Sequence, residues 1–290
     1  MTSIKEINGS TKLAAVIGSP ISHSLSPLIY NTNFEAQKQN AVYMAFETRE
    51  EETSSTIESL KQLNVLGINI TMPGKQQALQ NCDQIDQAAQ YVQAINLIVK
   101  QQGKWVGYNT DGIGFWESVK VIGKSISGSS ITLLGSGSTT RIILAQAVIE
   151  GAVNITVIAR NTYREMKIKS LINQLLEDYP NVKISLVDWH DGDKAKQSVN
   201  QADILVQTTH VGMWPNDNES LLEDSKWLNP KTLVCDIVYN PQETLLIQQA
   251  KERQCQTLGG IHMLVHQAAI NYKLMTGLEL DIENTLAQIK

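Results

Sequence analysis

The sequence is poor in cysteine and carries little excess charge of either sign. Its 290 residues include three cysteines, Cys82, Cys235 and Cys255, with no Cys-x-x-Cys spacing. Such an odd and scattered set predicts reduced thiols in a cytoplasmic protein rather than a disulfide framework. The 24 Lys and Arg residues against 29 Asp and Glu residues give a net charge of −5, which argues against a nucleic-acid-binding surface.

Long apolar runs and metal-ligand spacings are also lacking. No apolar run approaches the ~20 residues that a membrane span needs, and the first residues do not show the charged-then-apolar pattern of a signal peptide. We therefore expect a cytoplasmic protein with no membrane or nucleic-acid partner and no metal site. A hydrophobic content of 42% with 18% charged residues is typical of a globular chain, and the length is enough for two domains.

Short apolar runs alternate with helical patterns along almost the whole chain, which predicts an α/β protein with mainly parallel sheets. In the first half we expect strands at Leu13–Ile17, Ala41–Phe46, Gly67–Thr71, Ala94–Val99 and Trp105–Tyr108, with helices beginning near Ser26, Glu50 and Lys75. In the second half we expect strands at Ile131–Leu134, Ile155–Ala159, Lys183–Val187, Ile204–Gln207 and Leu233–Asp236. The second series has the order of a doubly wound nucleotide-binding fold.

The same pattern predicts two domains. We expect an N-terminal α/β substrate domain over residues 1–112 and a Rossmann-type dinucleotide-binding domain over residues 113–260. The glycine- and serine-rich segment Val119–Ser130 has the composition of a hinge between them. The last helices, residues 261–290, can pack on either half, including back on the first domain.

A glycine loop opens the second series. Gly135-x-Gly137 follows an apolar strand and begins a helix, which is the context that a dinucleotide site requires. The first glycine permits the tight turn and the second lets the backbone approach a pyrophosphate at the helix N-terminus. The neighbouring hydroxyls of Ser136, Ser138 and Thr139 can add donors. A simple strand–helix turn is the alternative interpretation.

The residues after the next strand indicate which dinucleotide is bound. A carboxylate there would accept a hydrogen bond from the ribose 2′-hydroxyl of NAD, but Ala159, Arg160, Asn161 and Thr162 supply none. The Arg160 guanidinium suits a 2′-phosphate instead, and we expect Ala159, Asn161 and Thr162 beside it in the cofactor site. The sequence therefore favours NADP, with NAD as the open alternative, although a solvated surface arginine would look the same.

One lysine and one aspartate stand out in the first half. Lys75 follows Pro73-Gly74 and Asp111 precedes Gly112, so both lie at turns after strands, where ligands bind in open α/β sheets. Either residue alone could be an ordinary charge at a helix start. Together they could transfer a proton, because burial and a partner charge tune an ammonium group. With a dinucleotide, such a pair indicates hydride chemistry on a small alcohol or ketone.

Several segments resemble those of shikimate dehydrogenases, in order and at fitting spacing over nearly the whole chain. They are Gly18–Pro27, Asn69–Lys75, Asn109–Gly112, Val211–Met213, Val238–Pro241 with Thr244–Leu246, and Met263–Leu264 with Gln267. Within that family, Tyr43–Glu47, Gly107–Asp111 and Asn218–Leu221 are similar to the quinate/shikimate branch. The resemblance implies reversible NADPH-dependent reduction of 3-dehydroshikimate to shikimate in a cleft between the domains.

The resemblance also implies roles for individual residues. Lys75 and Asp111 would hold the reacting oxygen and handle its proton. The substrate carboxylate would bind Ser24 and Ser26, and the ring hydroxyls and carboxylate would meet Thr71, Asn96, Tyr239 and Gln267. The cofactor would bind Gly135, Gly137, Ser138, Thr139 and Arg160, with Thr208, Met213, Ile237 and Gly260 flanking its adenine-to-nicotinamide stretch.

Some positions depart from the family pattern. Leu97 replaces a threonine, Ser138 a glycine, Ala159 an asparagine, Gly259 an aspartate and His262 a glycine. They predict weaker cofactor binding or an altered substrate preference. Two alternatives stay open, a quinate/shikimate enzyme that uses NAD and a ligand-binding pseudoenzyme of the same fold. One-carbon or amino-acid dehydrogenases would not explain the paired serines and Gln267. A monomer and a homodimer are equally compatible with the sequence.

Overall fold

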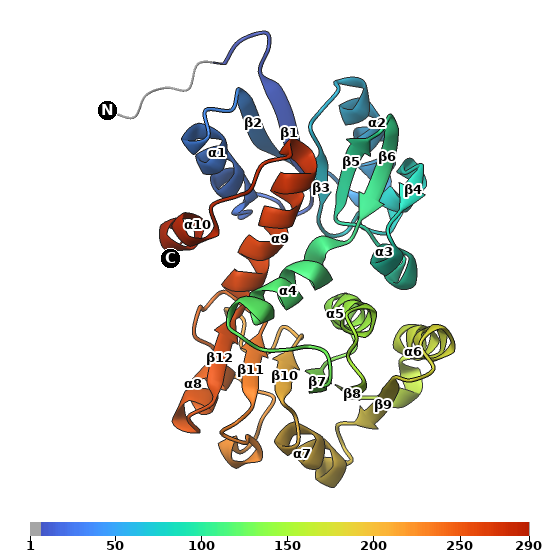
Figure 1. The fold of residues 1–290 in the computed structure, drawn as a ribbon, viewed down its shortest axis with the longest axis vertical. Helices are drawn as coiled ribbons and strands as arrows, with labels where there is room; N and C mark the ends of the chain where they lie inside the picture. The colour runs from blue at the N-terminus through green and yellow to red at the C-terminus, as the bar shows by residue number, and fades with distance from the viewer. Residues whose placement is uncertain (1–6, 290) are drawn as a thin grey trace. The chain divides into compact units, whose positions relative to one another are not determined.

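The computed structural model describes residues 7–289 (Figure 1). The chain divides into two compact units, residues 1–110 with 265–290 and residues 111–264. It leaves the first unit at the start of α4 (Thr110–Val121) and returns to it within α9 (Gly260–Thr276). The segment Val119–Ser130, expected as a hinge, therefore lies inside the second unit rather than at the division.

The first unit contains a six-stranded sheet in the order β2-β1-β3-β5-β6-β4. Its strands are β1 (Lys12–Gly18), β2 (Ala41–Glu47), β3 (Ile68–Ile70), β4 (Gln84–Ile85), β5 (Leu97–Gln101) and β6 (Lys104–Tyr108). β5 runs antiparallel to both β3 and β6, so this sheet is mixed where we expected mainly parallel pairing. The two-residue turn between β5 and β6 forces that direction, because parallel neighbours need a long crossover.

The helices of the first unit are α1 (Ser26–Ala36), α2 (Thr53–Gln62), α3 (Gln87–Val92), α10 (Ile282–Gln288) and, from Val265 on, α9, with 3₁₀ turns η1 (Glu50–Glu52) and η2 (Gln77–Asn81). The helix expected from Lys75 is only the turn η2. It ends at Asn81, whose side-chain amide donates to the Ser54 carbonyl oxygen on α2.

The second unit has the predicted doubly wound order, with six parallel strands arranged β12-β11-β10-β7-β8-β9. They are β7 (Ser130–Leu134), β8 (Asn154–Ala159), β9 (Lys183–Asp188), β10 (Ile204–Gln207), β11 (Leu233–Asp236) and β12 (Gln256–Gly259). The helices are α5 (Ser138–Ile149), α6 (Met166–Asp178), α7 (Gly192–Asn200) and α8 (Leu245–Glu252), with 3₁₀ turns η3 (Thr162–Arg164) and η4 (Ser225–Trp227). This confirms the predicted fold class.

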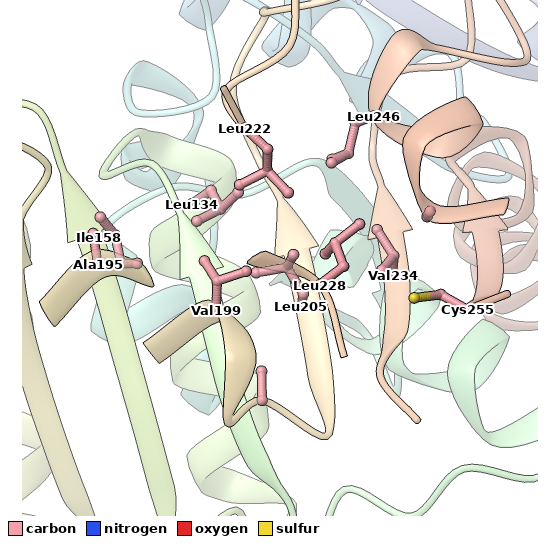
Figure 2. Close-up of a cluster of buried hydrophobic side chains, with 12 residues drawn as sticks. Leu134, Ile158, Ala195, Val199, Leu205, Leu222, Leu228, Val234, Leu246 and Cys255 are labelled. Atoms are coloured by element: carbon pink, nitrogen blue, oxygen red, sulfur yellow. The ribbon is translucent and has the colours of Figure 1, made fainter. Parts of the chain in front are cut away.

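A hydrophobic cluster fills one side of the second sheet (Figure 2). Leu134, Leu205 and Val234 come from three adjacent strands and meet Val199 of α7 and Leu246 of α8. The three strand residues are fully buried, as expected for parallel strands covered by helices. This packing fixes the carboxyl ends of β7 and β10, where the glycine loop and Thr208 follow.

Candidate active site

In the first unit, two predicted residues, Thr71 and Asn96, lie at one edge of the sheet. The Thr71 amide donates to the Ile17 carbonyl oxygen at 2.9 Å, next to the end of β1. Asn96 precedes β5, and its backbone accepts from Ile70 at 2.9 Å and donates to Tyr108 at 2.8 Å. Because β5 is antiparallel to its neighbours, its first residues lie beside the last residues of β3 and β6. Thr71 and Asn96 thus share an edge with Asn109 and Thr110, which follow β6.

Lys75 is tied to the same edge through its backbone. Its carbonyl oxygen accepts from the Ile95 amide at 2.9 Å, one residue before Asn96. The lysine is half-buried.

The turn that carries Asp111 is held by Asp86. The Asp86 carboxylate accepts from the Asn109 amide at 2.9 Å, and the Asn109 side chain donates to the Ala94 carbonyl oxygen at 3.0 Å. Burial raises the Asp86 pKa, against the lowering effect of the backbone donors from Asn109, Ala89 and Ala88. Asp111 comes two residues after Asn109, in the first turn of α4, so its backbone position follows from this anchor.

The serine loop after β1 is fixed by Glu47 at the end of β2. The Ser19 hydroxyl donates to Glu47 Oε1 at 2.6 Å and the Ile21 amide to Glu47 Oε2 at 3.2 Å. The Ser26 amide donates to Ser24 Oγ at 3.3 Å. Ser26 is the first residue of α1 and Leu25 is its N-cap.

Tyr239 lies in the second unit, on the loop that follows β11, and is 39% exposed. The buried Asp236 holds both ends of this loop, because it accepts from the Val238 amide at 2.9 Å and from the Thr244 hydroxyl at 2.7 Å. Thr244 in turn caps α8 by accepting from the Ile247 amide. The aromatic residue is therefore presented on a short anchored loop.

The glycine loop has the geometry that a dinucleotide needs. Gly135 has φ +121°, and a Cβ there would lie 2.8 Å from Thr208 Oγ1, so only glycine fits. Gly137 is the N-cap of α5, with open space where a Cβ would stand. The third fingerprint position, Thr140, is fully buried, and its hydroxyl lies 2.7 Å from that of Thr208. This bond ties the helix to β10 although Thr140 is larger than the usual glycine.

A cavity of about 530 Å³ adjoins this loop in the second unit. Five predicted cofactor residues line it: Gly135, Ser136, Gly137, Arg160 and Thr208. Further lining residues, none of them predicted to bind the cofactor, are Glu165, Trp189, Thr209, His210, Asn216 and Glu219. The predicted Ser138, Thr139, Ala159, Asn161, Thr162, Met213, Ile237 and Gly260 do not line it. Residues 209–211 could have been found, because they directly follow β10 at the ligand-binding edge.

Arg160 follows β8 and is exposed. The segment after it is held by Asp188 at the end of β9, which accepts from the Thr162 amide at 3.1 Å and from the Thr162 hydroxyl at 3.2 Å. The His190 and Thr162 amides lower the Asp188 pKa. The hydroxyl of Thr162 is thus bonded to the protein, which leaves the Arg160 cation as the strongest donor for an anionic group at this position.

The comparison with known proteins decides the family. The chain is 36% identical over 277 residues to the shikimate dehydrogenase (NADP(+)) of Alkaliphilus oremlandii, covering 96% of each sequence. The chain belongs to the shikimate dehydrogenase family. The model of the shikimate dehydrogenase substrate binding domain matches residues 16–98, and that of the shikimate 5′-dehydrogenase C-terminal domain matches residues 260–290.

Two further members of the family extend the comparison. The shikimate dehydrogenase (NADP(+)) of Lactococcus lactis subsp. cremoris is 36% identical over 286 residues, which cover 98% of this chain and 99% of the relative. The crystal structure of shikimate 5-dehydrogenase from Listeria monocytogenes in complex with shikimate and NAD is 30% identical, covers 99% of both chains and has a TM-score of 0.95. The predicted resemblance is therefore confirmed.

Residues 7–289 contain no group of three or more His, Cys, Asp or Glu side chains that could hold a metal ion. Within the same range, none of the helices has the length and apolar character needed to cross a membrane.

Proposed function

We propose that this protein catalyses the reversible NADPH-dependent reduction of 3-dehydroshikimate to shikimate. The observation that carries the proposal is the near-full-length relationship to NADP(+)-dependent shikimate dehydrogenases. The polar edge of the first sheet and the glycine-loop cavity of the second unit supply the groups that this reaction requires. A site lined by neutral hydrogen-bonding groups suits a polyhydroxylated ring, because analogues without the hydroxyls leave those groups unpaired.

In this reaction Lys75 and Asp111 handle the proton. During oxidation of shikimate the hydroxyl O–H proton passes to this pair, while the hydrogen on the same carbon leaves with both bonding electrons. During reduction the pair returns the proton to the carbonyl oxygen. NADP, when bound, accepts or supplies the hydride. Ser24 and Ser26 bind the substrate carboxylate, and Thr71, Asn96, Tyr239 and Gln267 bind the remaining polar groups.

The cofactor is held by the residues around the glycine loop. Gly135, Ser136, Gly137, Ser138 and Thr139 place backbone donors and hydroxyls near the pyrophosphate. Ala159, Arg160, Asn161 and Thr162 surround the 2′-phosphate, with Arg160 as its charged partner. Thr208, Met213, Ile237 and Gly260 flank the stretch from adenine to nicotinamide. Residues 113–260 are accordingly the cofactor domain, and residues 1–112 with the last helices are the substrate domain.

We also propose that the enzyme acts in the cytoplasm as a monomer or a homodimer. Its three cysteines are free thiols in the structure, which fits a reducing compartment. Light scattering at several protein concentrations distinguishes the two assemblies, and a larger particle would contradict both. Fractionation of the cells that produce the protein tests the compartment.

The deciding experiment follows the NADPH absorbance band after the protein is mixed with shikimate and NADP⁺. We expect reduction of NADP⁺ that is faster than with NAD⁺ and faster than with quinate in place of shikimate. Shikimate binding without any turnover would favour the pseudoenzyme. Turnover that prefers quinate and NAD⁺ would favour the quinate/shikimate alternative.

The proton-handling pair is tested by Lys75→Ala and Asp111→Asn. Each variant should lower turnover by a factor of about 10² or more, because general acid–base groups contribute on this scale, with little change in melting temperature. Lys104→Ala is the matched control, since Lys104 is exposed at the start of β6, at the far end of that strand from the Asn109 turn. Near-normal turnover in either test variant would contradict the assigned roles.

A further inference from the structure

Three predicted substrate-binding residues contact one buried polar network in the first unit. Tyr43, Asn69, Thr110 and Asn271 form this network, and their exposures are 1%, 7%, 0% and 0%. It reaches Ser26, Asn96 and Gln267. Burying polar groups costs free energy unless they are hydrogen-bonded, so the polar atoms of the network need hydrogen-bond partners. These hydrogen bonds determine how the side chains that the network contacts are oriented.

The first part of the network fixes Asn96. Tyr43, which the Ser26 side chain contacts by a hydrogen bond, donates its hydroxyl to Asn69 Oδ1 at 2.7 Å. Asn69 Nδ2 donates to the Asn96 carbonyl oxygen at 3.1 Å. The Thr110 backbone amide donates to Asn96 Oδ1 at 2.9 Å. An N–H group can only donate, so the Asn96 side chain turns its oxygen toward Thr110 and its NH₂ group the other way.

The second part of the network fixes Gln267. Thr110 Oγ1 lies 2.6 Å from Asn271 Oδ1 and 3.1 Å from Asn96 Oδ1. A hydroxyl has one proton, and the shorter contact takes it. Asn271 therefore faces Thr110 with its oxygen and donates from Nδ2 to Gln267 Oε1 at 3.0 Å. The two residues are four positions apart on α9, where side chains are neighbours.

Both amides consequently turn their oxygen toward the network and their NH₂ group away from it. An NH₂ group is a donor, which suits the carboxylate and hydroxyl oxygens of a polyol acid. Asn271 is costly in this place, because asparagine is a weak helix former and a fully buried amide must be paired. Besides Thr110 and Gln267, the Asn271 side chain also hydrogen-bonds to the buried Tyr30 hydroxyl.

We propose that Asn271 is a positioning residue which, held by the Thr110 hydroxyl, orients the Gln267 amide so that its NH₂ group faces the substrate. Thr110 and Asn271 do not touch substrate in this scheme and act through Gln267. The inference rests on the proposed function, since it takes Gln267 as a ligand of shikimate.

A double-mutant cycle tests the proposal. We measure KM and kcat with shikimate and NADP⁺, and the Kd of shikimate by calorimetry, for Asn271→Ala, Gln267→Ala and the double variant. Asn271→Ala should raise KM and Kd for shikimate roughly tenfold, the equivalent of about 1.4 kcal/mol, with little change in kcat and an unchanged KM for NADP⁺. In the Gln267→Ala background the same substitution should add nothing.

Further variants keep the test decisive if Asn271→Ala folds poorly. Asn271→Asp has nearly the same shape but lacks the NH₂ donor, so it should reproduce the rise in KM for shikimate. Thr110→Val should do the same, whereas Thr110→Ser keeps the hydroxyl and should restore the wild-type value. The control is Asn33→Ala, which removes a buried amide that bonds to Thr285 on α10; it should lower the melting temperature without changing KM.

Two results would overturn the inference. One is that Asn271→Ala raises KM and Kd for shikimate by the same factor in the wild-type and in the Gln267→Ala background. The other is that Asn271→Ala raises KM for NADP⁺ as much as KM for shikimate. Failure of the proposed function looks different, because the wild-type protein would then neither turn over nor bind shikimate, and the assignment of Gln267 as a ligand would fail with it.

Discussion

At the scale of single residues, Asp236 is the most strongly perturbed carboxyl group near the site. It is 2% exposed at the end of β11, and burial raises its pKa from 3.8 to about 6 in spite of donors from Thr244 and Val238. In the unfolded chain the same group titrates near 3.8. Between about pH 4 and pH 6 the folded protein thus binds more protons at this residue than the unfolded one.

This difference predicts that stability falls as the pH rises. Below about pH 4 the raised pKa of Asp236 contributes roughly 3 kcal/mol to the free energy of unfolding. This contribution is lost as the pH rises through about 6. Asp236→Asn cannot ionise and should lack this fall. Urea unfolding of both proteins from about pH 4 to about pH 7 measures it. Parallel stability profiles across this window would contradict the assignment.

Arg160 is expected to decide between the two cofactors. Arg160→Ala removes the planar cation proposed for the 2′-phosphate, so KM for NADP⁺ should rise by a factor of about 10 to 100, the size of a charge-assisted hydrogen bond. KM for NAD⁺ should stay within about twofold. Lys183→Ala, an exposed cation at the start of β9, is the control for net charge. Equal changes with both cofactors would show that Arg160 does not read the phosphate.

Sequence reasoning at this scale found residues with distinctive chemistry and missed those defined by burial. Lys75 and Asp111 were predicted as a pair, from their positions at turns after strands, and Arg160 from the missing carboxylate after its strand. Thr110 and Asn271 were not, since 161 positions separate them and only the folded unit brings them within 2.6 Å. Asp86 was missed for the same reason, because its partner Asn109 follows β6, 23 positions further along the chain.

At the scale of elements, the spacing of apolar residues along the sequence predicted most of the buried strands and helices well. β10 and β11 agree with the expected bounds because each is an apolar run buried along its length. α7 was missed because only Ala195 and Val199 are buried along its nine residues. The direction of β5 was also missed, since it depends on the tight turn before β6 rather than on residue pattern. Short or weakly amphipathic elements are decided by tertiary contacts.

The end of β1 shows how one element positions another. Gly18 has φ +155°, and a Cβ there would overlap the Thr71 side chain and lie 2.6 Å from the Met72 carbonyl oxygen. Gly18→Ala should therefore push β1 and β3 apart, lower the free energy of unfolding by about 1–3 kcal/mol and raise KM for shikimate through Thr71. Chemical denaturation and steady-state kinetics measure the two effects. Gly9→Ala, with no atom within 4 Å of its Cβ, should change neither the free energy of unfolding nor KM. If Gly18→Ala also left both unchanged, the packing argument would be contradicted.

At the scale of the whole molecule, the two units differ in how the chain builds them. The second unit is one continuous stretch, residues 111–264, whereas the first needs residues 265–290 from the other end of the chain. The hydrogen bond from Thr110 to Asn271 and that from Asn33 to Thr285 both join these two pieces. Tyr272 from the second piece packs at 5.4 Å from the Phe34 ring. The first unit therefore depends on contacts that are very distant in sequence.

This difference predicts how fragments behave. A polypeptide of residues 111–264 retains its six parallel strands, the cluster of Figure 2 and the glycine-loop cavity, so it should unfold cooperatively and be stabilised by NADP⁺ through mass action. A polypeptide of residues 1–110 lacks the partners of Asn33, Phe34 and Thr110 and should show no cooperative transition by itself. Adding a peptide of residues 265–290 should restore one. Thermal melts followed by circular dichroism, with and without NADP⁺, measure all three. A cooperative melt of residues 1–110 alone, or no response of residues 111–264 to NADP⁺, would show that the division of the chain does not correspond to independent folding.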